Sequence, residues 1–166
     1  MNERDEDLAR LQQLLDTSYA QAGRHLVAIH TPAARLTADA LVAAYTGMQV
    51  AVVATVASDG RPFTGPVDTF LHRGHLYFGT DASAVRTRHL DRDPVVSITH
   101  VRGESLVVTV HGEAVAEDLS GTDADFAART REHYGTAWDE WDPAPRAWWV
   151  RPHRMYAADM SVHASA

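Results

Sequence analysis

The residue types most suited to chemistry are gathered in one short stretch, where a strand-like run ends and a basic helical segment follows. Thr80 and Ser83 supply hydroxyl groups before this segment, and Arg86 and Arg88 supply guanidinium groups within it. The N–H groups of a first helical turn have no partner inside the helix, and the helix dipole favours an anion there. Such donors suit a phosphate monoester. A phosphate site is one interpretation, but the spacing by itself favours a surface helix whose arginines pair with Asp91 and Asp93.

Several other kinds of reaction centre are excluded by composition. The sequence has no cysteine and no lysine, so thiolate nucleophiles, thiolate metal sites and Schiff-base lysines are ruled out. Its ten histidines form no HExxH motif and no cluster with metal-ligand spacing. It contains no nucleophile elbow, Walker loop or dinucleotide-binding glycine motif. We therefore predict no metal and name no particular catalytic side chain.

Length and composition indicate one globular unit. The chain has 166 residues, of which 45% are hydrophobic and 22% charged, enough for a core without disulfides or metals. A formal net charge of −7 argues against a general nucleic-acid-binding protein. No apolar run approaches the ~20 residues of a membrane span, and the acidic N-terminus does not resemble a secretory signal. We expect a cytoplasmic protein without nucleic-acid or membrane partners.

The elements that must position the basic stretch form two groups, helices first and strands afterwards. Leucines at spacings of three and four predict a helix from residue 5 to about Gly23, and Thr37 is a natural N-cap for a short helix ending near Gly47. From residue 49 onward, β-branched runs between turn residues predict about six strands in meander order. The strands span residues 50–56, 61–71, 75–79, 95–101, 104–118 and 146–159, with helices at 83–92 and 123–134. Hairpin-length turns favour an antiparallel barrel.

Two patterns refine the expected strands. Pro62 and Pro66 predict that the second strand is an edge or carries a bulge, because proline cannot donate to a ladder. In the fifth strand, apolar residues alternate, which predicts one buried face. We divide the chain into a helical extension, residues 1–46, and a barrel domain, residues 47–166, which together form one compact unit.

Several motifs recur along this barrel in a fixed order. They are Asp59-Gly60-Arg61-Pro62, then Leu76-Tyr77-Phe78-Gly79-Thr80, then the basic helix before Asp93-Pro94, and finally the strand from Val150 to Tyr156. Together they resemble the pyridoxamine 5′-phosphate oxidase-like family of FMN-binding split barrels, over residues 48–159. The resemblance implies a mainly β fold with short helices, namely a six-stranded antiparallel split β-barrel with an N-terminal helical extension. It also implies a homodimer with flavin mononucleotide (FMN) at the subunit interface.

The resemblance assigns roles to residues of the basic stretch. Thr80 and Arg86 match, without a gap, the threonine and the basic residue that hold the flavin phosphate in the family. Ala84 stands where the family often has a serine, and Ser83 is a substitute for that serine. Arg61 aligns loosely with a phosphate-binding arginine of some members.

The resemblance also places the isoalloxazine ring against the second and third strands. Its contacts would be Pro66, Val67, Asp68 and Thr69, with Phe78 and Gly79 opposite, and the partner subunit would add Thr109, His111, Trp148 and Trp149. Considered alone, Val67 and Phe78 are typical core residues. Asp68 is a mid-strand carboxylate that needs a partner, either Arg61 or Arg88, unless it faces a substrate.

These observations lead us to expect a flavin-dependent oxidoreductase that transfers hydride through flavin N5 to or from an unknown small substrate. One alternative uses the deazaflavin F420 on the same fold, with Arg88 and Arg92 near its acidic tail. Another is a non-catalytic flavin- or haem-binding protein, with His100 or His111 as axial ligand. A dimeric scaffold with a degenerate site is the third.

Overall fold

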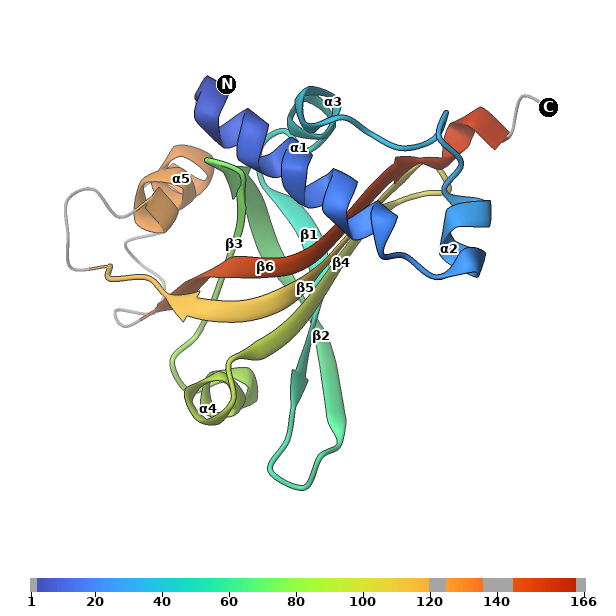
Figure 1. Cartoon of the computed structure of the whole chain (residues 1–166). Helices are drawn as coiled ribbons and strands as arrows, with labels where there is room; N and C mark the ends of the chain where they lie inside the picture. The colour runs from blue at the N-terminus through green and yellow to red at the C-terminus, as the bar shows by residue number, and fades with distance from the viewer. Residues whose placement is uncertain (1–2, 120–124, 136–144, 164–166) are drawn as a thin grey trace.

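The computed structural model describes residues 3–119, 125–135 and 145–163, and a closed barrel of six antiparallel strands forms its centre (Figure 1). The strands are β1 (Gln49–Val56), β2 (Pro62–His72), β3 (His75–Thr80), β4 (Val95–Arg102), β5 (Leu106–Ala116) and β6 (Arg146–Asp159). Around the barrel they follow the order β1-β2-β3-β6-β5-β4. The predicted six-stranded antiparallel barrel is therefore confirmed.

The expected meander order is wrong at one connection. The strands β3 and β4 follow one another in the chain but do not pair, since β3 pairs with β6 and β1 pairs with β4. The connection contains a helix, α4 (Val85–Arg92), and is therefore not a hairpin turn. The barrel thus consists of two three-stranded meanders joined along both edges.

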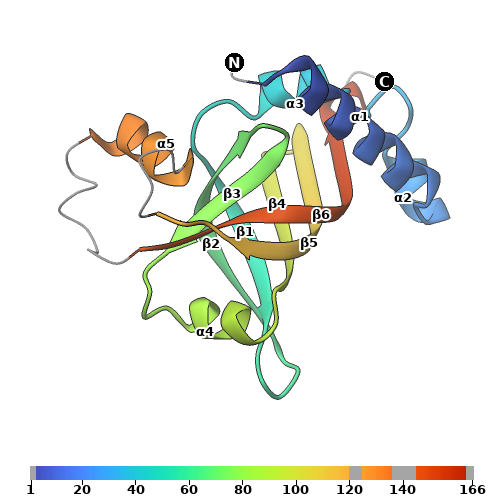
Figure 2. The same cartoon turned by 60° about the vertical axis from the view of Figure 1, so that its left-hand side comes forward.

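The other helices lie around the outside of the barrel (Figures 1 and 2). They are α1 (Asp5–Ala20), α2 (Arg24–Ile29), α3 (Ala38–Ala44), α5 (Asp125–Tyr134) and the 3₁₀ helix η2 (Met160–His163). Helix α1 packs along β6, α5 lies beside β3, and α4 lies at the opposite end of the barrel from α3. The sequence did not indicate α2 as a separate helix, and none of its residues is buried. None of the described helices is long and apolar enough to span a bilayer.

Strand alternation explains where the core lies. In β5, Leu106, Val108 and Val110 are buried, and the residues between them face outward, as predicted. The prolines of β2 lie in its first half, which pairs with β1 alone, since β3 joins β2 only from Thr69 onward. A free edge has no ladder bond for a proline to interrupt.

The N-terminal helices complete the barrel core rather than forming a core of their own. Leu11 and Leu15 of α1 and Leu41 of α3 belong to the same buried cluster as Phe78 of β3. Thr37 caps α3 as predicted, because its hydroxyl oxygen accepts a hydrogen bond of 3.2 Å from the Ala40 N–H. The extension therefore closes one end of the barrel.

Candidate functional site

The side chain of Arg86 connects α4 to β2. Its guanidinium donates a hydrogen bond of 3.4 Å to the carbonyl of Pro66. It also lies against Gly65 so closely that a Cβ at that position would be 2.6 Å from Arg86 Nη2. The guanidinium is half-buried, and burial lowers its pKa from the ordinary value. No carboxylate pairs with it among the residues that the structure describes.

The loop before α4 leaves further donors available. The Asp81 side chain accepts a 2.6 Å hydrogen bond from the Ser83 N–H, and the Asp81 carbonyl accepts from the Thr87 hydroxyl at 3.1 Å. Ala84 is the N-cap of α4 and supplies no side-chain bond. Within the described chain, the N–H groups of Val85 and Arg86 have no hydrogen-bond acceptor. The first turn of α4 thus offers two free amides, and it carries a guanidinium without a carboxylate partner among the described residues, a combination that favours an anion.

The position of α4 is set by contacts with the hairpin of β1 and β2. His89 is buried, its Nδ1 lies 2.9 Å from the Thr55 hydroxyl, and its ring meets Phe63 edge-on at 5.1 Å. The Arg92 guanidinium donates to the carbonyl of Val56. A cavity of about 130 Å³ lies beside these groups and is lined in part by Gly65, Arg86 and His89. These contacts hold the guanidinium of Arg86 in a defined place.

The other predicted phosphate ligands differ in how they are placed relative to the loop before α4. Thr80 ends β3, immediately before the loop, and Ser83 lies exposed within the loop. The exposed Arg88 donates a 3.2 Å hydrogen bond to the Ser83 carbonyl. Arg61 lies in the turn between β1 and β2 and is paired with Asp59 at 2.7 Å.

Two residues near this site were not indicated by the sequence. Gly65 leaves the space that the Arg86 guanidinium occupies. Arg146 of β6 is the register partner of Thr80, and its guanidinium lies 2.9 Å from the Asp91 carboxylate of α4. Both depend on strand pairing between distant segments, so no local motif could have shown them.

The residues predicted to contact the ring divide between two faces of the sheet. Val67, Thr69 and Phe78 are buried inside the barrel, and the Thr69 hydroxyl lies 2.6 Å from that of Tyr45. Their side chains point into the core, so these three residues could meet a ring outside the barrel only through their backbone. Strand alternation is the physical reason, since it sends neighbouring side chains to opposite faces. Pro66 is exposed and can present its backbone.

Two ring candidates, Asp68 and Gly79, face outward and are covered by α5. The Tyr134 hydroxyl donates a hydrogen bond to the Asp68 carboxylate, so neither Arg61 nor Arg88 is the partner. Burial, and then the bond to Asp68 and its charge, raise the pKa of Tyr134 to about 12. A Cβ on Gly79 would lie 2.1 Å from the Phe126 ring. Helix α5 therefore forms a lid over this part of β2 and β3.

The residues predicted to reach a partner's flavin are also divided. Thr109 and His111 face outward on β5, where the His111 Nδ1 lies 2.8 Å from the Ser97 hydroxyl. Trp148, in contrast, is buried and stacks on Phe78 with centroids 5.4 Å apart. The side chain of Trp148 therefore belongs to the core and does not point to the outside of the barrel. Trp149 packs against the ring of His75.

The two candidate haem ligands occupy different environments. His100 is buried inside the barrel, its Nδ1 lies 2.8 Å from the Val50 carbonyl, and its ring meets that of Tyr45 at 4.9 Å. His111 is exposed. Only His111 is accessible to a large planar ligand. In the described part of the chain, no three histidine, aspartate or glutamate side chains come together to hold a metal ion.

Comparison with known proteins gives a family and a set of related folds. Residues 37–159 match the family model of pyridoxamine 5′-phosphate oxidase. No curated protein sequence matches the chain.

Solved structures share the fold at low sequence identity. The conserved hypothetical protein Rv2991 from Mycobacterium tuberculosis has a TM-score of 0.62 and 18% identity, covering 78% of this chain and 89% of its own. The heme storage protein HutZ from Vibrio cholerae has a TM-score of 0.56 and 18% identity, covering 66% and 86%. Atu2129 from Agrobacterium tumefaciens, of unknown function, has a TM-score of 0.57 and 19% identity, covering 66% and 50%. The chain thus spans about half the length of Atu2129.

Proposed function

This chain belongs to the pyridoxamine 5′-phosphate oxidase family, and we propose that it is an FMN-binding oxidoreductase that works as a homodimer. The main supporting observation is the half-buried guanidinium of Arg86, which lacks a carboxylate partner among the described residues and belongs to a helix whose first N–H groups are free. Such a group is costly to leave uncompensated, and a phosphate monoester would satisfy it. FMN carries this group, and bound flavin would supply hydride transfer at its N5.

The chain's own residues would then have separate tasks. Arg86 and the N–H groups at the start of α4 would bind the phosphate, and Thr80 and Ser83 would add hydroxyl donors. The backbone of β2 at Pro66 would support the flavin beside that phosphate. Asp68, held by Tyr134, would lie next to it on the outer face of β2. The lid formed by α5 would exclude water from the ring.

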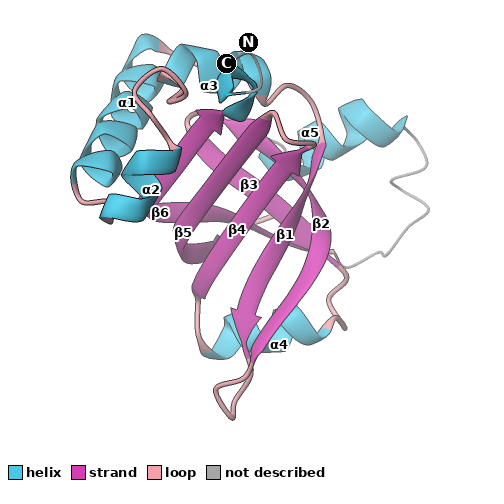
Figure 3. Cartoon of the chain, turned by 90° about the vertical axis from the view of Figure 1, so that its right-hand side faces the viewer, coloured by secondary structure: helices cyan, strands magenta, loops and turns pink. Residues whose placement is uncertain are grey.

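The homodimer is supported by an uncovered sheet surface. We call the outward side chains of β1, β4 and β5 the open face, and no described helix lies in front of it (Figure 3). Four of its valines are about half-exposed, namely Val50 (59%), Val52 (46%), Val95 (51%) and Val101 (55%). Exposed apolar side chains gathered on one face of a sheet are typical of a protein interface. Thr109 and His111 lie on the same face, in register with Thr99 and Ser97 of β4.

Binding of FMN and riboflavin by purified protein tests the proposal, because only FMN carries a phosphate. Arg86→Ala should weaken FMN about 30-fold and riboflavin about twofold at most. Gly65→Ala should act in the same direction without changing charge, since its Cβ would displace the guanidinium. Arg24→Ala, at an exposed arginine in the first turn of α2, is the matched control. Equal losses for both flavins, or no flavin binding at all, would overturn the proposal.

Two other cofactors, F420 and haem, are alternatives to FMN, and a specific observation supports each of them. Arg88 is exposed, so it could meet the acidic tail of F420, whereas Arg92 is engaged by Val56. HutZ, a heme storage protein, shares the fold, and His111 is accessible on the open face. Titrations with F420 and haemin, run in parallel with FMN, distinguish the three possible cofactors. Tight F420 binding that Arg88→Ala weakens selects the deazaflavin, and a Soret band that His111→Ala abolishes selects haem.

A further inference from the structure

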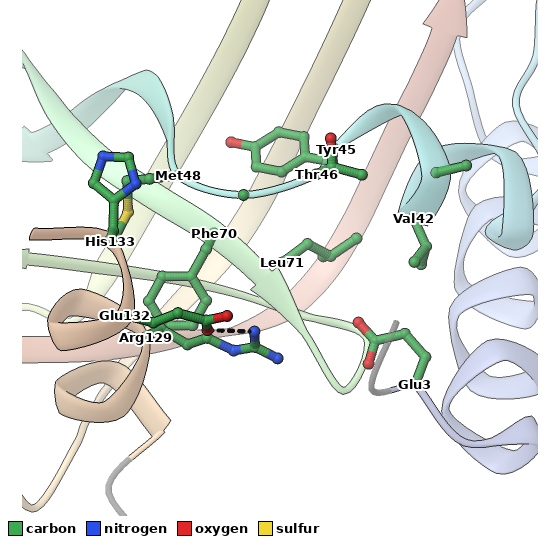
Figure 4. Close-up of a pocket in the computed structure, with 12 residues that line it drawn as sticks. Glu3, Val42, Tyr45, Thr46, Met48, Phe70, Leu71, Arg129, Glu132 and His133 are labelled. Carbon is green, nitrogen blue, oxygen red and sulfur yellow. Dashed lines mark hydrogen bonds and ion pairs between the residues drawn. The ribbon is translucent and has the colours of Figure 1, made fainter.

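A second cavity, of about 600 Å³, lies between the end of α3, the last part of β2 and helix α5 (Figure 4). None of the residues predicted for flavin binding lines it. Arg86 belongs to α4, which lies at the other end of the barrel from α3 (Figure 2). The volume falls within the roughly 300–1,000 Å³ range of small-molecule sites. This cavity is therefore a separate candidate for ligand binding.

The floor of the cavity is apolar and aromatic. Phe70 and Leu71 of β2 lie below, Met48 closes one side, and Tyr45 lies above (Figure 4). The hydroxyl of Tyr45 already lies 2.6 Å from that of Thr69, so this residue offers the cavity its ring. Such a floor suits the apolar body of a ligand.

The rim of the cavity carries more acid than base. Glu3 reaches in from the N-terminal segment, and Arg129 and Glu132 reach in from α5 on the other side (Figure 4). The Arg129 guanidinium is already engaged, with Glu132 Oε2 at 3.0 Å and His72 Nδ1 at 3.4 Å. Glu3 Oε2 accepts a 2.7 Å bond from the Arg73 backbone N–H.

Each of the two glutamates has a second carboxylate oxygen without a partner in the described chain. Two carboxylates against one guanidinium leave the rim with a negative charge. His133, which lines the same rim, forms a ring contact with Tyr134 at 4.5 Å. A positively charged group on a ligand would therefore be attracted to this rim, while its apolar part lies on the floor.

From this arrangement we infer that the cavity binds a small aromatic molecule with a single ammonium group. The ring would lie against the apolar floor, and the ammonium group would approach the free oxygen of Glu132 at the rim. The inference is independent of the flavin site, because the two sites share no residue.

Calorimetric titration of the full chain at pH 8, with and without FMN, tests it with three probes of similar shape. They are 1-naphthylmethylamine, the uncharged 1-naphthalenemethanol and the anionic 1-naphthoate. The amine should bind about tenfold more tightly than the alcohol, and naphthoate should bind most weakly. Naphthoate binding as tightly as the amine, or an amine that does not bind at millimolar concentration, would overturn the inference. Competition between FMN and the amine would also overturn it.

Two variants locate the binding. Glu132→Gln should weaken the amine about fivefold and leave the alcohol unchanged, and Glu104→Gln, at an exposed turn outside the cavity, is the matched control. Ala43→Trp should block the cavity and abolish binding of both probes, while the melting temperature stays unchanged because Ala43 is exposed. Unaltered binding by Ala43→Trp would place the ligand elsewhere and refute the inference.

Discussion

The outer surface of the barrel has two apolar faces that differ in what covers them. On β2, β3 and β6, the outward residues Phe70, Tyr77 and Ala147 are buried under Phe126 of α5, and we call this the covered face. On β1 and β4, the outward valines of the open face are about half-exposed. Both faces follow the same strand alternation. The difference shows that this chain covers one face with its own helix and leaves the other without a described helix in front of it.

Truncation of the residue that covers the first face should have the largest effect. Phe126→Ala removes a ring that packs against Gly79 and Phe70, and should lower the free energy of unfolding by about 3 kcal/mol. Val52→Ala on the open face is the control and should cost about 0.5 kcal/mol at most in the isolated subunit. Urea unfolding at low protein concentration measures both. If both substitutions lowered the free energy of unfolding equally, the covered and open faces would not differ in the way described.

A charge on the open face should act on assembly rather than on the fold. Val52→Asp would place a carboxylate in the proposed interface and should weaken the dimer by about 2 kcal/mol, or about 30-fold. Val27→Asp, at an exposed valine of α2, is the control. Light scattering across a concentration series gives the dissociation constant. A wild-type chain that is monomeric throughout, or a Val52→Asp dimer of unchanged strength, would contradict the comparison.

Removal of the hydrogen bond between Tyr134 of α5 and Asp68 of β2 should lower the free energy of unfolding by a smaller amount, and this amount should depend on pH. Tyr134→Phe removes the donor to Asp68 and should cost about 1 kcal/mol at pH 8. The pKa of Tyr134 is raised to about 12, so the folded state holds this proton more tightly than the unfolded chain does. Its contribution is complete below about pH 10, the ordinary tyrosine value, and is lost as pH rises towards 12.

Unfolding free energies of wild type and Tyr134→Phe, measured between pH 8 and pH 12, check this prediction. Burial also raises the pKa of Tyr19 and Tyr45 to about 12, so both proteins should lose stability over this range. The difference between them should shrink as pH rises. A difference that grows with pH would show that Tyr134 does not hold α5 in this way.

Local patterns in the sequence predicted the elements well. Thr37 caps α3, residues Arg146–Asp159 form the last strand as expected, and the alternation in β5 gives its buried face. These features depend on capping, turn chemistry and side-chain period, all of which act within a few residues. The expected flavin residues Thr80, Ser83 and Arg86 came from the resemblance to the family of FMN-binding split barrels.

Local sequence patterns could not predict which residues contact one another across the barrel. The pairing of β3 with β6 brings Arg146 beside Thr80, and that of β1 with β2 places Gly65 where Arg86 needs space. Likewise, the burial of Trp148 and the bond between Tyr134 and Asp68 depend on how distant segments pack.

The sequence alone determined six strands, N-terminal helices and a basic helix after the third strand, because those elements arise from neighbouring residues. Only the tertiary structure decided which outward face α5 covers, which carboxylate Tyr134 binds and where the 600 Å³ cavity lies. The physical reason is that strand order and helix docking depend on contacts between residues far apart in the chain. Their free energies are set by mutual packing, which no local spacing encodes.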